Sequence, residues 1–295
     1  MAVVIRRIFF PLKVKLCLLW AIFVVTAVMV LPAHARQTDA STPTVVSLDE
    51  CADQYVMGLM PRTQVLALSN HAQLPDSNFR DRARGLPRVR PTLEAILSLH
   101  PQAVIRTWGG DAKLLQALQR YGIKIIGIND VSSYAQARDE LFRVGHELNQ
   151  DASAGIEAHR FDSALRAIVP FGHNRTVLYY TTFGYSAGPD TMVGDMLQRL
   201  GFRLETQDKG YTPLPPEVLL SLQPDVFALG FYDDPYGMRR VPGRHPLVRD
   251  YIAHHRNFTL PQTLLSCSGW FTAYDLQALS DNEAKFEAAQ KGGMN

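Results

Sequence analysis

The sequence predicts an α/β protein of two similar lobes joined by one long linking α-helix, and three observations support this fold class. In the first part of the chain, short runs rich in β-branched residues alternate with helix-like segments, which is typical of parallel α/β architecture. A long stretch of helical periodicity follows, and the alternation then begins again. A short helix–proline–strand sequence of the first part also has an echo in the second. The predicted boundaries are 42–130 for the first lobe, 131–170 for the linking helix and 171–295 for the second lobe.

The first 35 residues have the pattern of an export signal. A basic region precedes the nearly apolar run 16–31, and Ala33-His34-Ala35 supplies small residues where a signal peptidase reads them. We expect cleavage after Ala35. The alternative is a retained membrane anchor, because the apolar run approaches the length that spans a bilayer. The small residues at its end favour cleavage.

Removal of 35 of the 295 residues leaves 260, enough for a large core in one domain or two lobes. The leader holds four basic and no acidic side chains, so the formal net charge falls from +2 to −2. The basic balance of the whole chain therefore does not indicate nucleic-acid binding. Two cysteines remain, Cys51 and Cys267. In an oxidising compartment they can form a disulfide, or they can stay two separate buried thiols.

Both lobes are predicted from short apolar runs between helix-like segments. Strands are predicted at 45–48, 64–69, 102–107, 123–128, 176–182, 225–230 and 264–266. Helices are predicted at 49–60, 113–121, 191–200, 216–222 and 275–290.

The linking helix is predicted from spacing. From Tyr134, apolar residues recur at intervals of three and four, as on one face of an α-helix, and the pattern continues less regularly to Pro170. The alternative is two helices joined at Gly155.

The echo relates two helix starts. Glu94 to Pro101 aligns with Glu217 to Pro224, and both copies share a Leu-Ser-Leu run. Each helix opens after proline and carries its glutamate in the first turn, where the helix dipole favours a negative charge. The simplest explanation of both glutamates is this local stabilisation of the helix start. The echo together with the long helix nevertheless predicts two similar lobes.

With these features in order, the chain resembles the periplasmic substrate-binding proteins of the ABC importers for siderophores, haem and cobalamin. The resemblance covers almost the whole chain after the leader, through the segments 45–48, 93–101, 122–125, 222–226 and 268–270. It implies two Rossmann-like lobes, a single linking helix, a ligand cleft between the lobes and a periplasmic location. It also implies a monomeric, non-enzymatic protein without a cofactor, a bound metal or a nucleic-acid partner.

The resemblance further assigns roles to particular residues. Glu94 and Glu217 match the glutamates with which such proteins dock onto arginines of the ABC permease dimer in the inner membrane. Charge-assisted contacts a lobe apart would fix the register on a two-fold partner. The ligand would lie at the carboxyl ends of the strands, and the candidate ligand-binding residues there are Arg88, Trp108, Tyr180, Phe183, Tyr185, Tyr211, Tyr232, Arg240 and Trp270.

Aromatic rings with arginines suit a large, flat, anionic chelate. The sequence therefore favours a ferric siderophore, with cobalamin or haem as the alternative ligands in the same role. Arg88 is the strongest candidate among the arginines, because its counterpart across the echo, Tyr211, also lies in a loop that should face the cleft. Its charge favours an anionic ferric complex over a corrinoid.

One motif indicates a different class of function. Gly184-Tyr185-Ser186-Ala187-Gly188 fits the G-x-S-x-G pattern of an α/β-hydrolase nucleophile. Ser186 would then need an acid and a base, for which the candidates are Asp225, Asp233, Asp250, His254 and His255. A hydrolase explains neither the long helix nor the echo, and Pro189 delays the helix that should start at the nucleophile.

The remaining classes have weaker support. A metal-ion-binding relative would need about three converging histidines, but the nine histidines are scattered. Two cysteines fall short of the four ligands of a structural zinc site. No Walker A or dinucleotide-binding glycine pattern is present, so the ATPase of an importer would be a separate chain.

Overall fold

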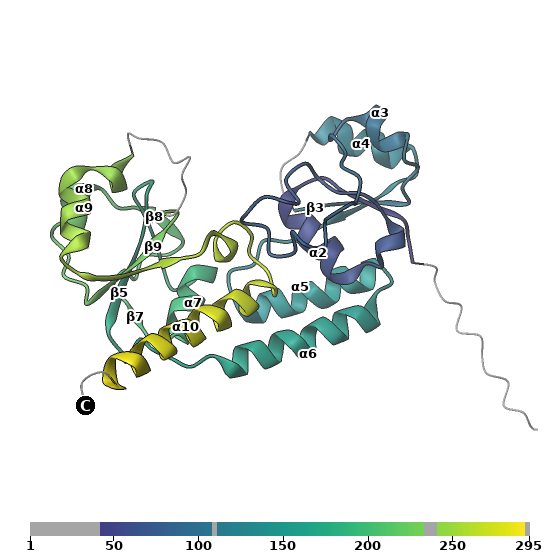
Figure 1. The fold of residues 1–295 in the computed structure, drawn as a ribbon. Coiled ribbons are helices and arrows are strands. Elements are labelled where there is room, and N and C mark those ends of the chain that lie inside the picture. Colours follow the sequence, from purple (N-terminus) through teal and green to yellow (C-terminus); the bar gives the residue numbers. More distant parts are fainter. Residues whose placement is uncertain (1–41, 108–110, 233–240, 293–295) are drawn as a thin grey trace, which may run out of the picture. The chain divides into compact units, whose positions relative to one another are not determined.

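The computed structural model describes residues 42–107, 111–232 and 241–292, with side chains up to residue 285. The predicted export signal, Trp108 and Arg240 therefore lie outside the described residues. The strands of the described residues form two parallel four-stranded sheets and one two-stranded antiparallel ribbon (Figure 1). The predicted α/β class with parallel sheets is confirmed.

The first sheet has the strand order β2-β1-β3-β4, with all strands parallel. Its strands are β1 (Val45–Ser47), β2 (Val65–Ala67), β3 (Ala103–Arg106) and β4 (Lys124–Gly127). Its helical elements are α2 (Glu50–Leu59), η1 (Arg62–Gln64), α3 (Leu93–Leu97) and α4 (Ala112–Arg120). Helix α2 packs on one face and α3 with α4 on the other. Burial on both faces explains why these strands read as short apolar runs.

The second sheet has the order β10-β9-β5-β7, again all parallel. Its strands are β5 (Thr176–Thr181), β7 (Arg203–Leu204), β9 (Val226–Gly230) and β10 (Arg256–Leu260). The antiparallel ribbon pairs β6 (Tyr185–Ala187) with β8 (Tyr211–Pro213). The helical elements are α7 (Met192–Arg199), α8 (Pro216–Leu219), η2 (Pro242–Arg244), α9 (Pro246–Ala253), η3 (Gln262–Leu264) and α10 (Thr272–Gly292). The strand predicted at 264–266 is wrong, because η3 and a turn occupy this stretch.

The echo corresponds to a repeated fold. Counted along the chain, the strands of each sheet are arranged in space as second, first, third, fourth. The starts of α3 and α8 and the starts of β3 and β9 are separated by the same 123 positions as the sequence echo. The two sheets are therefore versions of one unit, as the sequence predicts.

The linking segment differs from its prediction, because it forms two helices instead of one. Helix α5 (Tyr134–Glu147) ends where Asn149 takes a left-handed φ of 56°, and α6 (Asp151–Ala167) begins two residues later. Asn tolerates this conformation better than most residues. The helices run antiparallel, since Arg138 of α5 bonds to Asp162 of α6 at 3.1 Å. The alternative joint at Gly155 is also wrong, because Gly155 lies inside α6.

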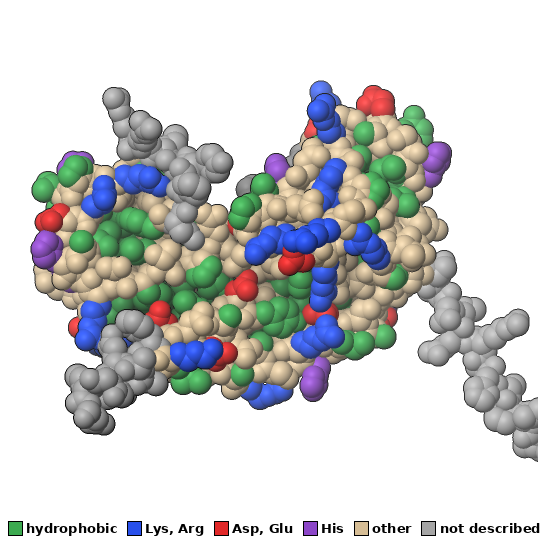
Figure 2. All heavy atoms as spheres, viewed as in Figure 1, with side chains coloured by type: hydrophobic (Ala, Val, Ile, Leu, Met, Phe, Trp, Pro, Cys, Tyr) green, Lys and Arg blue, Asp and Glu red, His purple; other side chains and the backbone are tan. Residues whose placement is uncertain are grey.

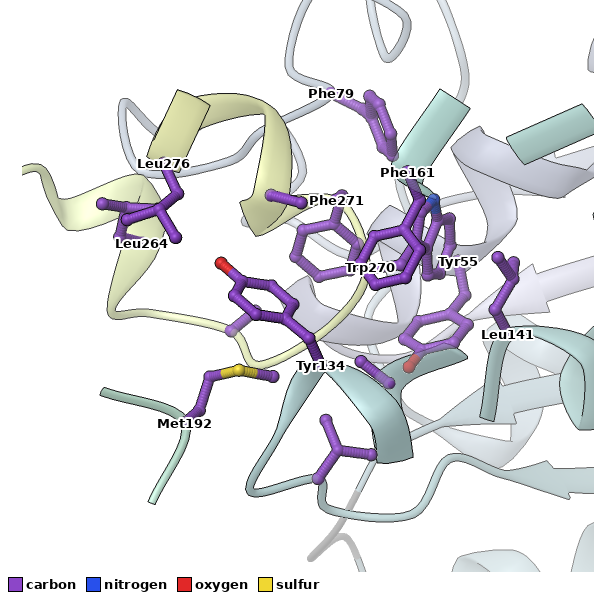
Figure 3. Packing of buried hydrophobic residues seen from close by; sticks show 14 of the residues in the cluster. Tyr55, Phe79, Tyr134, Leu141, Phe161, Met192, Leu264, Trp270, Phe271 and Leu276 are labelled. Carbon is purple, nitrogen blue, oxygen red and sulfur yellow. The ribbon is translucent and has the colours of Figure 1, made fainter. Parts of the chain in front are cut away.

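The main apolar cluster is continuous from the first sheet through α5 and α6 to the second sheet. Its centre gathers Tyr55, Tyr134, Phe161, Trp270 and Phe271 (Figure 3). Helix α10 lies beside α6 (Figure 1), where Tyr274 donates a hydrogen bond of 2.9 Å to Glu157. Two smaller clusters fill the other face of each sheet. The linking helices therefore belong to the shared core.

The close contact of α5 with α6 can be tested with two glycines. A Cβ on Gly145 would lie 2.6 Å from the Cβ of Ala154, whereas one on Gly155 would meet nothing within 4 Å. We expect Gly145→Ala to lower the free energy of unfolding by about 1–3 kcal/mol through overpacking. Gly155→Ala, the matched control, should raise it by about 0.5–1 kcal/mol through helix propensity. Urea unfolding measures both, and equal effects would contradict the packed hairpin.

The surface charges of the described residues are partly paired. In the face drawn in Figure 2, acidic side chains lie between the basic ones. One ion pair joins Arg84 to Asp81 at 2.8 Å, with side chains that are 76% and 75% exposed. An exposed pair of this kind adds little stability. Within the described part of the chain, no helix is both long and apolar enough to cross a membrane.

Candidate ligand-binding pocket

A pocket of about 470 Å³ lies at the carboxyl end of β5, against the β6–β8 ribbon. Its volume falls in the range of small-molecule sites, roughly 300–1,000 Å³. One wall residue, Asp130, follows β4 of the first sheet, and two come from the stretch between η3 and α10. The lining residues are Asp130, Tyr179, Thr181, Phe183, Tyr185, Val193, Tyr211, Phe231, Leu265 and Ser268.

Three of the predicted ligand-binding residues meet in this pocket: Phe183, Tyr185 and Tyr211. They are 42%, 42% and 54% exposed, so their rings are accessible to a ligand. The tight turn after β5 depends on Gly184, whose φ is +82° and whose Cβ would lie 2.9 Å from Pro242. The β6–β8 ribbon pairs Ala187 with Tyr211, which places Tyr185 and Tyr211 on the same side of the ribbon.

Tyr180 does not line the pocket, and Tyr179 does. Successive side chains of a strand point to opposite faces, so Tyr179 and Thr181 face the pocket. Tyr180 is fully buried on the other face, in the cluster beneath α8 and α9. Burial raises the pKa of its hydroxyl to about 12. The structure therefore places Tyr180 outside the lining of this pocket and its neighbour Tyr179 within it.

Three further predicted residues lie elsewhere. Trp270 is fully buried in the core, with its ring 4.7 Å from Tyr55 and 5.1 Å from Phe271 (Figure 3). The guanidinium of Arg88 donates to carbonyls of its own loop, those of Leu86 and Ala83, both at 3.3 Å.

Tyr232 is also absent from the pocket lining. Its hydroxyl donates to the carbonyl oxygen of Gly243 at 3.2 Å, and its ring packs against the outer cluster of the second sheet. The structure therefore places Arg88, Tyr232 and Trp270 outside the lining of this pocket.

Sequence reasoning missed Asp130, Tyr179 and Phe231. All three lie at or just beyond the carboxyl end of a parallel strand, and that position was the available signal. Phe231 directly follows β9 and has a φ of 61°. Asp130 is the only charged side chain among the described lining residues.

Two of the pocket phenols, those of Tyr179 and Tyr211, are stabilised in the neutral form. Burial raises the pKa of Tyr179 well above its usual value. Tyr211 is 54% exposed, but its hydroxyl lies against Thr191 and the backbone of Val193. Burial of this hydroxyl, and then the charge of Asp130, raise the pKa of Tyr211. The described lining is thus aromatic and supplied with hydroxyl groups for hydrogen bonding.

The position of Ser186 does not fit the hydrolase alternative. Ser186 lies inside strand β6, is fully buried and has its hydroxyl 3.2 Å from that of Thr206. A hydrolase nucleophile instead sits exposed at a strand-to-helix turn. The candidate bases His254 and His255 each contact a backbone carbonyl one turn back, at 2.7 and 2.8 Å. Among the described residues there is also no cluster of three or more His, Cys, Asp or Glu that could hold a metal ion.

The two candidate docking glutamates are both exposed, in the first turns of α3 and α8. Helix α3 is capped by Thr92, whose hydroxyl accepts the amide hydrogen of Ala95, and α8 begins at Pro216. The repeated unit therefore presents one carboxylate at the same structural position of each sheet's outer helix.

Cys51 and Cys267 form a disulfide, with 5.3 Å between their Cα atoms. The bond joins the first turn of α2, in the unit of the first sheet, to the stretch that precedes α10. The two separate thiols that the sequence left as an alternative are not what the structure contains.

The chain has the two-lobe fold of periplasmic solute-binding proteins, because solved structures that share it over most of its length are of that class. One is a possible iron-binding (periplasmic solute-binding) protein from Staphylococcus epidermidis, with a TM-score of 0.64 and 17% identity, covering 81% of this chain and 98% of that one. Another is a periplasmic heme-binding protein of Vibrio cholerae, with a TM-score of 0.63 and 18% identity, covering 80% and 97%.

A curated relative is similar in sequence. It is a cobalamin-binding protein of Halobacterium salinarum, 25% identical over 206 residues, which cover 66% of this chain and 56% of the relative. The chain thus spans little more than half the length of the curated relatives it matches. No family model matches the sequence.

Proposed function

We propose that this chain is the periplasmic solute-binding component of an ABC importer and that it carries a corrinoid. The observation that supports this most is the pocket at the end of β5, which offers aromatic rings and hydroxyl groups and, among its described lining, a single charge. A corrinoid presents a wide flat ring edged with neutral amides. Rings supply contact area for the macrocycle, and hydroxyls and a carboxylate accept hydrogen bonds from amide N–H groups. The name of the curated relative agrees with this ligand class.

The pocket holds only part of so large a ligand. A volume of about 470 Å³ accommodates one edge or one axial group of the macrocycle, with the rest covered by neighbouring surface. Export through residues 1–35 would place the protein in the periplasm. It acts there as a monomeric carrier without catalytic chemistry, and it docks on the permease through Glu94 and Glu217.

Ferric chelates are the second candidate, on two observations. The first is that structural neighbours include heme-binding proteins. The second is that Tyr185 and Tyr211 lie on one side of the β6–β8 ribbon, where a phenolate could ligate ferric iron. The raised pKa of Tyr211 opposes the phenolate in the unliganded protein. The sequence preference for an anionic siderophore rested on arginines together with aromatic rings. The guanidinium of the strongest arginine candidate, Arg88, is bonded to its own loop.

The test is a titration of residues 36–295 with cyanocobalamin, hemin, a ferric catecholate and a ferric hydroxamate, followed by calorimetry. We expect cyanocobalamin to bind at least tenfold more tightly than the others, which is about 1.4 kcal/mol. Phe183→Ala and Tyr211→Ala should each weaken that binding about 10- to 100-fold, because aromatic anchors in a pocket dominate binding energy. Tyr121→Ala, at a 66% exposed tyrosine outside the pocket, is the matched control and should bind normally. Absence of cyanocobalamin binding would refute the ligand assignment.

A further inference from the structure

We propose that the Cys51–Cys267 disulfide positions one wall of the pocket, so that ligand affinity depends on whether this bond is intact. The inference rests on the proposed function, because it takes the pocket beside β5 to be the ligand site. It assigns a role in binding to two residues that do not line the pocket themselves.

The wall in question is the crossing segment, residues 261–271, which leaves β10 of the second sheet and runs against α2 of the first unit. Two of its residues, Leu265 and Ser268, line the pocket. Cys267 lies between them in sequence and is bonded to Cys51. Both pocket residues are therefore within two positions of a covalent anchor on α2.

Weaker contacts assist this anchor. The hydroxyl of Ser266 donates to the carboxylate of Asp76 at 2.7 Å, and the side-chain amide of Asn78 donates to the carbonyl of Thr263 at 3.1 Å. Leu264 is buried in the main apolar cluster and holds the start of the segment. Leu265, Ser266 and Ser268 are only partly buried, so without the disulfide these contacts leave the stretch 265–268 free to shift locally.

Asp76 also has a second partner at the start of α2. Burial and the nearby charge of Asp76 raise the pKa of Glu50 to about 8, so the Glu50 carboxyl holds a proton at neutral pH and can hydrogen-bond to Asp76. Asp49 and Asp53, the other carboxylates facing Glu50, act in the same direction. Experiments on the disulfide should therefore be run at one pH below this value, such as pH 6.5.

The far end of the crossing segment has its own anchor. Trp270 is fully buried, and Thr272 donates a hydrogen bond of 2.9 Å to the carbonyl of Gly269. Loss of the disulfide should therefore free residues 265–268, between the buried Leu264 and Trp270, without unpacking the core. That limit separates a positioning role from a purely structural one.

Reduction by a dithiol supplies the test. Dithiothreitol transfers two electrons and two protons, the S–S bond becomes the thiols of Cys51 and Cys267, and the reagent closes to its own cyclic disulfide. We expect the affinity for cyanocobalamin to fall about tenfold on reduction. Cys51→Ser/Cys267→Ser should bind like the reduced protein and should not respond to dithiothreitol.

Two further measurements make the test specific. By linkage, a tenfold difference in affinity means that saturating cyanocobalamin lowers the reduction potential of the disulfide by about 30 mV. Hydrogen exchange should quicken in residues 265–268 on reduction and remain slow in α5 and α6. Leu118→Ala, a core change in the outer cluster of the first sheet, is the control for lost stability and should keep full affinity.

The outcomes separate the two proposals. If oxidised and reduced protein bind cyanocobalamin equally, or reduction lowers only the melting temperature, the positioning role is wrong and the proposed function stands. If the oxidised protein binds another member of the panel instead, the same comparison is made with that ligand, and only the corrinoid assignment fails. If none of the four ligands binds, both proposals are overturned.

Discussion

Replacing Glu94 and Glu217 together by alanine is expected to abolish ligand uptake while leaving ligand affinity unchanged. Both carboxylates are exposed in the first turns of α3 and α8, which are equivalent helices of the repeated unit. Neither lines the pocket. Removing them should therefore act only where the protein meets its permease, through lost charge-assisted contacts with arginines.

The measurement is uptake in cells that depend on this chain for the ligand, together with calorimetry on the purified variants. Each single variant should reduce uptake at least tenfold, and the defect should grow with ionic strength because salt screens such contacts. The matched control is Asp139→Ala/Asp208→Ala, which removes two exposed carboxylates from other surfaces. A double Glu variant that loses ligand affinity, or one that transports normally, would contradict the docking assignment.

Replacing Trp270 by alanine is expected to lower the free energy of unfolding by about 3–5 kcal/mol, the usual cost of deleting a buried large aromatic side chain. The indole makes edge contacts with Tyr55 and Phe271 and approaches α2 at Gly58, where a Cβ would lie 2.7 Å from the ring.

Urea unfolding measures this loss, and ligand affinity is measured where the variant stays folded. Trp270→Phe should retain most of the stability, because it keeps a ring in the site. Ile156→Ala, at a residue 56% exposed on α6, should change stability by no more than about 0.5 kcal/mol. A Trp270→Ala protein that is fully stable but no longer binds ligand would instead return this residue to the pocket.

The sequence predicted what depends on local pattern. Runs such as Val45-Val46 and Ala103–Ile105 become the central strands of a sheet buried on both faces. The echo located α3 and α8 and the strands that follow them, because prolines and apolar residues recur at a fixed offset. These features need no knowledge of distant contacts.

The sequence could not predict where the chain reverses, which face of a strand a side chain occupies, or which distant segments come into contact. The reversal at Asn149 leaves the apolar periodicity almost intact, because Leu148 and Ala154 both face the same core. Strand β5 is buried on both faces, so its sequence has no polar alternation to show that Tyr179 and not Tyr180 faces the pocket. Asp130 became a wall residue only through the contact of its loop with the second unit.

The disulfide between positions 51 and 267 closes most of the described chain into one covalent ring, since 216 positions separate its two cysteines. Tension applied to the ends of the described chain would pass along residues 42–51, across the sulfur bridge and out through α10. Everything from α2 to β10 would carry almost none of that load while the bridge holds. A pulling experiment on the oxidised protein should therefore extend only the two outer segments, and reduction should restore the full contour length.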